Sequence, residues 1–275
     1  DCISEKVISI KSELFECKSS EILFTSHENG ACSMGIFISE SISASITNTN
    51  FKNCLGIQDG CAIQCLSQNS NETMITINSC TFEECTPNKA NVYTTNRAVN
   101  FVNNTITTKS SNDKLNGLFV NYMCQLFIDE CTFTRCSYSA TNGSSIKYIP
   151  TSYDEDVIES IIIQNCIFTE CTGYASIASI YPVFSHPKFI NLTIENSNHN
   201  FNFIIEMQSF APIKEESGEV LLQNVSFLNT NPDGNVAVGG GGCGFLYHTT
   251  ISDEDRVSFN GCHFENTFYQ QADSD

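Results

Sequence analysis

The sequence predicts an all-β fold, a single-stranded parallel β-helix of about nine coils stacked along one axis. A short unit, Ile75-Thr76-Ile77-Asn78-Ser79-Cys80-Thr81-Phe82-Glu83-Glu84-Cys85, returns along the chain, and its apolar alternation changes parity at one polar position. The copies recur within the roughly 20–50 residues typical of solenoid repeats. Such units bury a continuous core only when they stack on one another.

Each copy carries one large apolar residue, called the anchor below, that we expect to point into the core. The closest copies are centred on Phe82, Phe133 and Phe168, and looser copies extend the series along the chain. We therefore interpret residues 1–275 as a single domain with irregular terminal coils. The predicted core ladder consists of Leu14, Phe51, Phe82, Ile106, Phe133, Phe168, Ile194, Phe227 and Phe264.

A corner is expected inside each unit. Ile75 and Ile77 share one parity, whereas Cys80 and Phe82 share the other, so the strand must turn between the two pairs. The residues at that position are mostly types that favour turns. The predicted corners are Lys11, Asn48, Ser79, Asn103, Glu130, Asn165, Asn191, Asn224 and Gly261.

A third strand follows most copies and is often entered through glycine, as in Gly60-Cys61-Ala62-Ile63 and Gly117-Leu118-Phe119-Val120. Polar excursions near 150–157, 207–219 and 230–243 interrupt the pattern and are predicted to be exposed loops. Loops are where solenoids usually carry binding.

The 15 cysteines fall mainly in two columns that flank the anchors. The first column comprises Cys80, Cys131, Cys166 and Cys262, and the second comprises Cys17, Cys54, Cys85, Cys136 and Cys171. A buried thiol packs as a small hydrophobe, which favours an inward thiol ladder. Adjacent coils lie about 4.8 Å apart, so disulfides such as Cys54–Cys85 or Cys136–Cys171 are also geometrically open.

Asn-x-Ser/Thr sequons provide a second class of candidate site. They occur at Asn71, Asn103, Asn142, Asn191 and Asn224. Three of them coincide with predicted corners, where an outward asparagine could accept a glycan. With the cysteines, they favour an extracellular or cell-surface protein, although an Asn- and Thr-rich chain also forms sequons by chance.

The charge balance excludes one class of partner. With 13 Lys and Arg against 31 Asp and Glu, the net charge is −18, which cannot neutralise the phosphates of a nucleic acid. No apolar run approaches the roughly 18 residues of a membrane helix, so we expect no membrane insertion within this segment. The histidines are scattered and Cys-x4-Cys lacks a partner histidine, so we expect no catalytic residues, no cofactor and no metal site.

The units Phe51-Lys52-Asn53-Cys54, Phe82-Glu83-Glu84-Cys85 and Phe168-Thr169-Glu170-Cys171 resemble the repeats of chlamydial polymorphic membrane proteins. Similar β-helical surface proteins occur in trichomonads and other protists. The asparagine that usually ends the Phe-x-x-Asn unit is Cys, Ser, Thr or Lys here. The resemblance implies a right-handed β-helix of the pectin-lyase-like type and a role as a surface adhesin or passenger domain.

We therefore expect a non-enzymatic structural or adhesive protein whose loops recognise a protein or glycan partner. The competing class is the carbohydrate-binding or carbohydrate-degrading β-helix. Polysaccharide hydrolases of this fold need paired aspartates and lyases need a basic residue beside Ca²⁺-binding carboxylates. The chain contains no Asp-Asp pair, and arginine occurs only at Arg97, Arg135 and Arg256.

Overall fold

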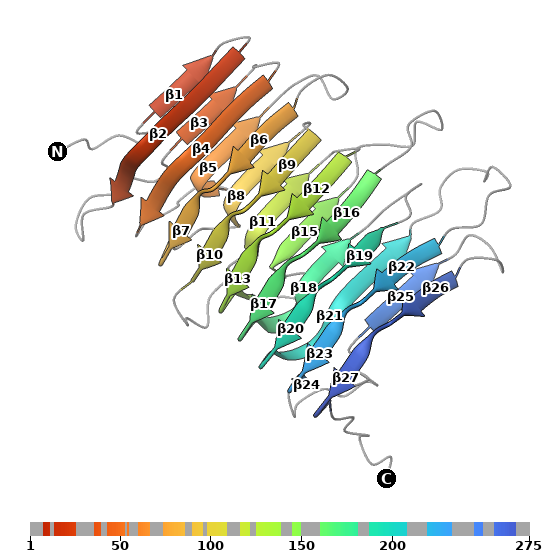
Figure 1. Cartoon of the computed structure of the whole chain (residues 1–275). Coiled ribbons are helices and arrows are strands. Elements are labelled where there is room, and N and C mark those ends of the chain that lie inside the picture. Colours follow the sequence, from red (N-terminus) through yellow and green to blue (C-terminus); the bar gives the residue numbers. More distant parts are fainter. Residues whose placement is uncertain are drawn as a thin grey trace, which may run out of the picture.

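A computed structural model shows a parallel β solenoid, in which strands of successive coils lie side by side along one axis (Figure 1). It describes residues 8–11, 14–25, 36–39, 43–52, 54, 60–66, 74–85, 90–95, 98–108, 116–121, 125–138, 145–149, 160–180, 187–207, 219–232, 245–249 and 256–267. Within these ranges the secondary structure is β-strand, without a helix.

One wall of the solenoid is an 11-stranded sheet. Its strands include the predicted third strands of the coils, and neighbours pair in parallel, as Ile36–Ile38 do with Ile63–Cys65. The strands are β1 (Ile8–Lys11), β3 (Ile36–Ser39), β5 (Gly60–Leu66), β8 (Ala90–Thr95), β11 (Asn116–Asn121), β14 (Ser137–Tyr138), β15 (Ile146–Ile149), β18 (Thr172–Ile180), β21 (Asn198–Met207), β24 (Asn231–Pro232) and β25 (Phe245–Thr249).

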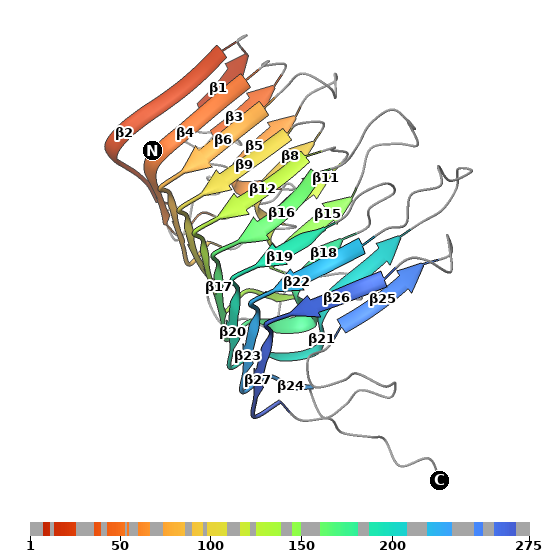
Figure 2. The same cartoon turned by 45° about the vertical axis from the view of Figure 1, so that its right-hand side comes forward.

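A 16-stranded sheet forms the remaining walls and has two arms that meet at an angle (Figure 2). β2 (Leu14–Thr25) and β4 (Ser43–Lys52) run through both arms without a break. The first arm continues with β6 (Met74–Asn78), β9 (Ala98–Val102), β12 (Gln125–Asp129), β16 (Ser160–Gln164), β19 (Lys188–Ile190), β22 (Glu219–Gln223) and β26 (Arg256–Asn260). The second arm continues with β7 (Thr81–Glu83), β10 (Thr105–Thr107), β13 (Thr132–Thr134), β17 (Ile167–Thr169), β20 (Thr193–Glu195), β23 (Ser226–Leu228) and β27 (His263–Glu265).

The corner between the arms is confirmed by its backbone. A left-handed φ between 51° and 64° occurs at Asn48, Ser79, Asn103, Glu130, Asn165, Asn191, Asn224 and Gly261. Asparagine and glycine adopt this conformation at little cost, which explains the composition of the position. Lys11 differs from the prediction, because it lies at the end of β1 and pairs with Ser39 in the other sheet.

The anchors from Phe51 onwards lie in one ladder. Parallel pairing joins Phe51 to Phe82, Phe82 to Ile106, Ile106 to Phe133 and Phe133 to Phe168, and then continues through Ile194 and Phe227 to Phe264. The rings of Phe133 and Phe168 stack 4.9 Å apart. Every member is fully buried except Phe264 in the last described strand, which is 45% exposed.

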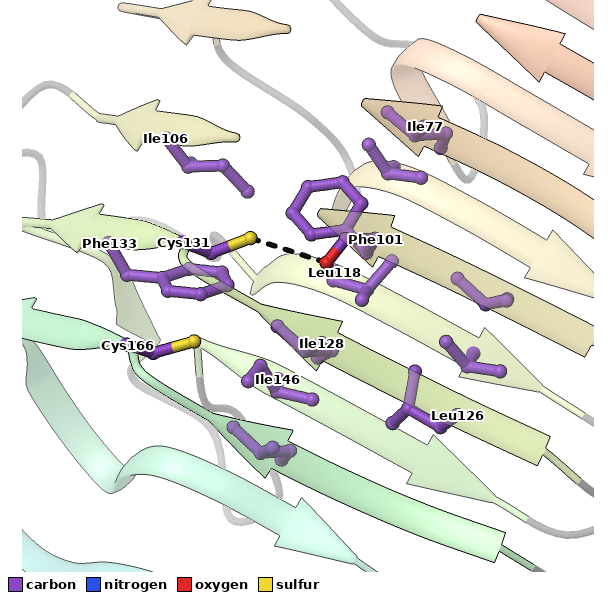
Figure 3. Close-up of a cluster of buried hydrophobic side chains, with 14 of the residues drawn as sticks. Ile77, Phe101, Ile106, Leu118, Leu126, Ile128, Cys131, Phe133, Ile146 and Cys166 are labelled. Atoms are coloured by element: carbon purple, nitrogen blue, oxygen red, sulfur yellow. Dashed lines mark hydrogen bonds between the residues drawn. The ribbon is translucent and has the colours of Figure 1, made fainter. Parts of the chain in front are cut away.

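Phe101, from β9 in the first arm, fills the gap that Ile106 leaves in the ladder of rings (Figure 3). Its ring centroid lies 6.2 Å from that of Phe82 and 6.4 Å from that of Phe133. The shorter Ile106 leaves room that an aromatic ring from the facing arm occupies. Ring contacts therefore continue from Phe51 to Phe168 across a coil whose own anchor is aliphatic.

Gly117 explains why glycine precedes the third strand in its coil. A Cβ built on Gly117 would lie 2.8 Å from the carbonyl oxygen of Ser145 and 3.2 Å from the ring of Phe133. At Gly117 the backbone of β11 thus passes too close to the backbone at Ser145 for any side chain, and the core ladder leaves little room as well. From the sequence, glycine was noted only as a frequent entry to the third strand, and at Gly117 the structure shows that its reason is close packing.

The first coil corrects two sequence-based assignments. Leu14 pairs with Ser43 and Cys17 with Ile46, so neither lies in the predicted core ladder or second column. The residue that pairs with Phe51 is Phe24. The spacing Leu14-x-x-Cys17 matches that of an anchor and its cysteine in the later coils. In the structure, however, both residues pair with the first-arm part of β4, and the pairing register changes between Lys18 and Ile22, before Phe24.

The predicted loops lie largely outside the described residues. Residues 150–157 connect β15 to β16, and the excursion near 207–219 connects β21 to β22. The one near 230–243 begins later than expected, because Thr230 is buried and Asn231–Pro232 form β24.

Candidate functional site

The described cysteines line the core on both sides of the anchors and are present as thiols. In the first column Cys80, Cys131 and Cys166 are each 1% exposed, whereas Cys262 in the last coil is half-buried. In the second column Cys54, Cys85, Cys136 and Cys171 are at most 5% exposed. Figure 3 shows Cys131 and Cys166 beside Phe133.

The thiols donate hydrogen bonds to carbonyl oxygens at the corners. Cys131 Sγ lies 3.1 Å from Asp129 O in its own coil and 3.3 Å from Phe101 O in the preceding coil. Cys85 Sγ repeats the pattern with Glu83 O at 3.5 Å and Phe51 O at 3.6 Å. Each thiol therefore supplies a donor at a bend in the backbone as well as apolar volume.

At several column positions that lack a cysteine, another small donor takes its place. Thr49 Oγ1 donates to Thr47 O at 3.0 Å, and Ser197 Oγ donates to Glu195 O at 3.3 Å. Asn104 stands in the first column, where its Nδ2 donates to Ile77 O and its Oδ1 accepts from the backbone N–H of Cys80, both at 2.8 Å. The second column thus shares an inward, small hydrogen-bond donor, whereas Leu192 and Val225 occupy first-column positions as buried apolar residues without a donor.

Thr108 occupies the second column in the coil anchored by Ile106. It is fully buried, and its hydroxyl donates to the carbonyl oxygen of Arg135. The sequence placed Lys109 at this position, three residues after the anchor, and predicted that a local loop would force it outward. The chain instead buries Thr108 one residue earlier, and Lys109 lies outside the described residues.

Thiols on neighbouring coils form hydrogen-bonded pairs. Cys131 pairs with Cys166, and this contact followed by burial raises the pKa of Cys166. Cys136 pairs with Cys171, which, together with burial, raises the pKa of Cys136 well above its ordinary value. Burial also acts to raise the pKa of Cys171, but hydrogen bonds with Cys136 and Ser145 lower it overall.

A third group contains three thiols. The Cys85 thiol is hydrogen-bonded to the thiols of Cys54 and Cys61, and these contacts hold its pKa well below its ordinary value. Cys61 comes from β5, across the core from the second column, and its Sγ donates to Asn91 Oδ1 at 3.3 Å. Burial, followed by the contact with Cys85, raises the pKa of Cys61 well above its ordinary value. Grouping the cysteines in columns did not reveal the place of Cys61.

Asparagine side chains form a row of hydrogen bonds on the exposed corner between the arms. Asn165 Nδ2 donates to Asp129 Oδ1 at 2.8 Å, Asn191 Nδ2 to Asn165 Oδ1 at 3.0 Å, and Asn224 Nδ2 to Asn191 Oδ1 at 3.1 Å. Asn103 Nδ2 donates to Ser79 Oγ at 3.0 Å in the same way. The row links the corners of successive coils on the outside of the solenoid.

Three sequons coincide with this row. Asn103, Asn191 and Asn224 are exposed, and each Nδ2, the atom that a glycan would occupy, already donates to the preceding coil. An amide nitrogen that carries a sugar keeps one hydrogen, so a glycan and the row are compatible. Asn71 and Asn142 lie outside the described residues.

The sequence did not reveal a second corner, which lies two residues after the anchor. A left-handed φ between 51° and 57° occurs at Glu84, Arg135, Glu170, Asn196, Asn229 and Asn266. Asn229 Nδ2 donates to Asn196 Oδ1 at 3.3 Å, and Asn266 Nδ2 donates to Asn229 Oδ1 at 3.0 Å, which forms a second exposed row. The polar residue that follows each short second-arm strand was the available signal.

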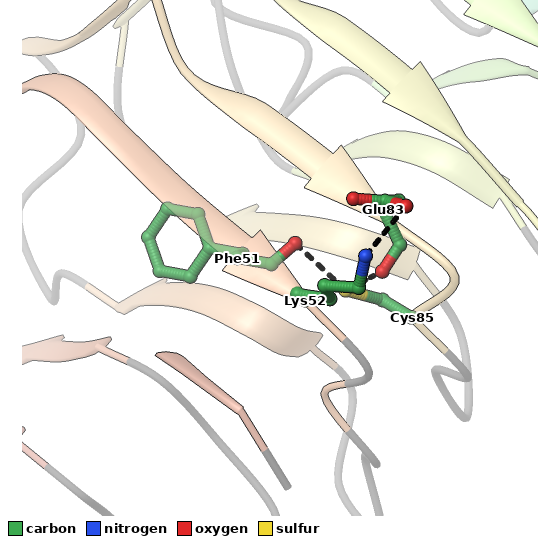
Figure 4. Close-up of polar contacts among 4 residues, drawn as sticks. All are labelled: Phe51, Lys52, Glu83 and Cys85. Atoms are coloured by element: carbon green, nitrogen blue, oxygen red, sulfur yellow. Dashed lines mark hydrogen bonds and ion pairs between the residues drawn. The ribbon is translucent and has the colours of Figure 1, made fainter. Parts of the chain in front are cut away.

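On the outside of the second arm, Lys52 Nζ lies 2.8 Å from Glu83 Oε1, one coil away (Figure 4). The hydrogen bond with Glu83 raises the pKa of Lys52. Both side chains are about 40% exposed, so the pair contributes little to stability. Figure 4 also shows the contact between the Cys85 thiol and the carbonyl oxygen of Phe51.

In the described part of the chain, His, Cys, Asp and Glu form no group of three or more that could hold a metal ion. The acidic runs 154–156 and 253–255 fall outside it. Nor do the described residues include a helix that is long and apolar enough to cross a bilayer.

The fold defines the class of this chain, a parallel β-solenoid protein with a cysteine-lined core. Comparison of the chain with protein-family models, with curated proteins and with solved structures finds no match in any of the three.

Proposed function

We propose that this chain is a structural or adhesive module at the cell surface or outside the cell, which presents its loops to a protein or glycan partner. The observation that carries the proposal is the continuity of the interior. Buried side chains form one hydrophobic cluster from Ile36 to Phe227. The inward positions of each coil are therefore used for packing, which suits a stiff support.

The resemblance to surface β-helices supports the finer details of this proposal. We take the solenoid to be right-handed, because parallel β crossovers are right-handed in about 98% of cases. We also take it to be one domain of about nine coils. Its recognition elements are the loops near 150–157, 207–219 and 230–243. Their acidic and polar composition suits exposed segments that a partner reads.

The exposed corners support an extracellular location. The sequons at Asn103, Asn191 and Asn224 lie on a solvent-facing edge, where an attached glycan would not disturb the core. The paired thiols suit a compartment in which disulfides form. We infer that the net charge of −18 keeps such a surface soluble and self-repelling.

The test measures binding and chemistry on the same preparation. The full chain, labelled with a fluorophore, is applied to a glycan array and to epithelial cell monolayers, beside a variant in which a Gly-Ser turn replaces residues 150–157. We expect the wild type to bind one of these surfaces and the loop variant to lose that binding while unfolding at the same temperature. A Thr134→Ala variant on the second arm serves as the control and should bind as the wild type does.

A second measurement separates adhesion from catalysis. The chain is incubated with polygalacturonate, and new reducing ends are measured. We expect none above the buffer blank. Release of reducing ends would instead identify a carbohydrate-degrading β-helix. Equal binding by the wild type and the loop variant would show that residues 150–157 are not the contact.

A further inference from the structure

We propose that Cys54, Cys61 and Cys85 form a thiol–disulfide exchange site inside the solenoid, in which Cys85 bonds to either of the other two. The site lies where the second arm meets the sheet that contains β5. Cys54 follows β4, Cys85 follows β7 on the next coil, and Cys61 reaches the same point from β5. Its substrate class is a low-molecular-weight disulfide.

The backbone register brings Cys54 and Cys85 together. Phe51 pairs with Phe82 and Lys52 with Glu83, so the two cysteines that follow lie on adjacent rungs of the second column. Adjacent parallel strands are about 4.8 Å apart, within the Cα separation that a disulfide spans. Cys85 Sγ also contacts Phe51 O at 3.6 Å, which directs the thiol toward the preceding coil.

Cys85 is the common partner of the other two thiols. Its sulfur is hydrogen-bonded to both Cys54 and Cys61, and these contacts lower its pKa in the assembled coils. The thiolate is the nucleophile in disulfide exchange. Cys61 is instead held protonated by burial, and it donates to Asn91 as well. Once the coils have assembled, Cys85 is therefore the one thiol of the three that contacts both of the others.

The chemistry consists of two exchange steps. The Cys85 thiolate attacks one sulfur of glutathione disulfide, whose S–S bond breaks and releases one glutathione thiolate. The thiolate of Cys54 or Cys61 then attacks the Cys85 sulfur and releases the second glutathione. Two protein thiols are oxidised and one glutathione disulfide is reduced. Attack by the remaining thiol on Cys85 exchanges one protein disulfide for the other.

The burial of the three thiols determines when they can react with glutathione disulfide. Cys54, Cys61 and Cys85 are at most 5% exposed in the folded chain, so glutathione must reach them while the coils assemble. Refolding is therefore the condition in which the site reacts. A natural comparison lies three coils further on, where Cys171 contacts Cys136 and the hydroxyl of Ser145. Because a hydroxyl cannot form a disulfide, that group has one possible product.

The experiment uses the full 275-residue chain. It is unfolded in urea with reductant, refolded in a glutathione redox buffer, quenched with acid, alkylated and mapped by mass spectrometry without reduction. We expect Cys85 to be linked to Cys54 in some molecules and to Cys61 in others, with the third thiol alkylated. Cys171 should be linked to Cys136 alone. Recovery of Cys85 as the alkylated thiol, or linked to a cysteine elsewhere, would overturn the proposal.

Serine variants test the role of each thiol, because a hydroxyl retains the donor at the corner. In Cys61→Ser all linked Cys85 should be joined to Cys54, and in Cys54→Ser to Cys61. In Cys85→Ser both remaining thiols should be alkylated, whereas a Cys54–Cys61 disulfide in that variant would show that Cys85 is not the common partner.

The matched control is Cys80→Ser. Cys80 is equally buried but lies in the first column, between Thr49 and Asn104 of the neighbouring coils. This variant should give the wild-type distribution of Cys85 disulfides, and a changed distribution would count against a local site. Protease resistance of each variant in reducing buffer establishes that it has folded, and the wild-type map decides the proposal even where a variant does not fold.

Discussion

The thiol of Cys131 donates a hydrogen bond across coils to the carbonyl oxygen of Phe101, 3.3 Å away, while Phe101 itself fills the space beside Ile106. Phe101 thus completes the stack of rings with its side chain and accepts a hydrogen bond from a thiol at its backbone carbonyl. This arrangement joins three features of the solenoid: the ring stack, the corner and the first cysteine column. It also indicates which substitutions should be costly.

Replacing Cys131 by alanine should cost about 1–2 kcal/mol of unfolding free energy, because it removes a buried sulfur and the donor to two carbonyl oxygens. Cys131→Ser should cost less, since Thr49 and Ser197 show that a hydroxyl serves at equivalent corners. Urea unfolding in reducing buffer measures both. If serine proved the more destabilising of the two, volume and not hydrogen bonding would govern the column.

Phe133→Ala should cost about 3–5 kcal/mol, because the ring is fully buried between Phe101 and Phe168. Phe264→Ala is the matched control in the same core ladder. Its ring stacks on Phe227 at 5.0 Å but is 45% exposed, so its loss should cost clearly less. Equal costs from urea unfolding would mean that burial in the ladder is not what stabilises these coils.

Glu130→Asn should stabilise the chain by about 0.5–1 kcal/mol. Glu130 has a φ of 53°, a conformation that costs most side chains about 1–2 kcal/mol and that asparagine tolerates better. The control is Gln125→Asn, an exposed position at the start of β12 that is not among the left-handed residues. Thermal unfolding should show a gain for the first variant only, and no gain would mean that the corner is not strained.

Stability in reducing buffer should fall as the pH rises above about 9. The pKa of Cys166 is raised from 9.0 in the folded chain, by Cys131 and then by burial. Above the unfolded-state pKa the unfolded chain releases a proton that the folded chain keeps, so the folded state loses its advantage. Cys166→Ser should show a shallower decline than the wild type, whereas Thr49→Ser, which removes no thiol, should not. Parallel curves for Cys166→Ser and the wild type would contradict the assignment.

The sequence by itself determined the repeat, the first corner and the alternation that directs anchors and cysteines inward. These features are local. The apolar alternation changes parity at Asn78-Ser79, and a small residue stands close to Phe82, so both signals can be read within one strand and the bend that follows it. The same locality explains the mistake at Leu14, where spacing imitated an anchor and only pairing with β4 identified Phe24.

The tertiary structure alone decided which distant groups meet. Phe101 enters the ring stack from the opposite arm, and Cys61 joins Cys85 from another sheet. Loops of unequal length separate these residues, so spacing along the chain carries no information about their contact. Only the parallel register of neighbouring coils brings them together, because each rung is set by the backbone hydrogen bonds of the rung before it.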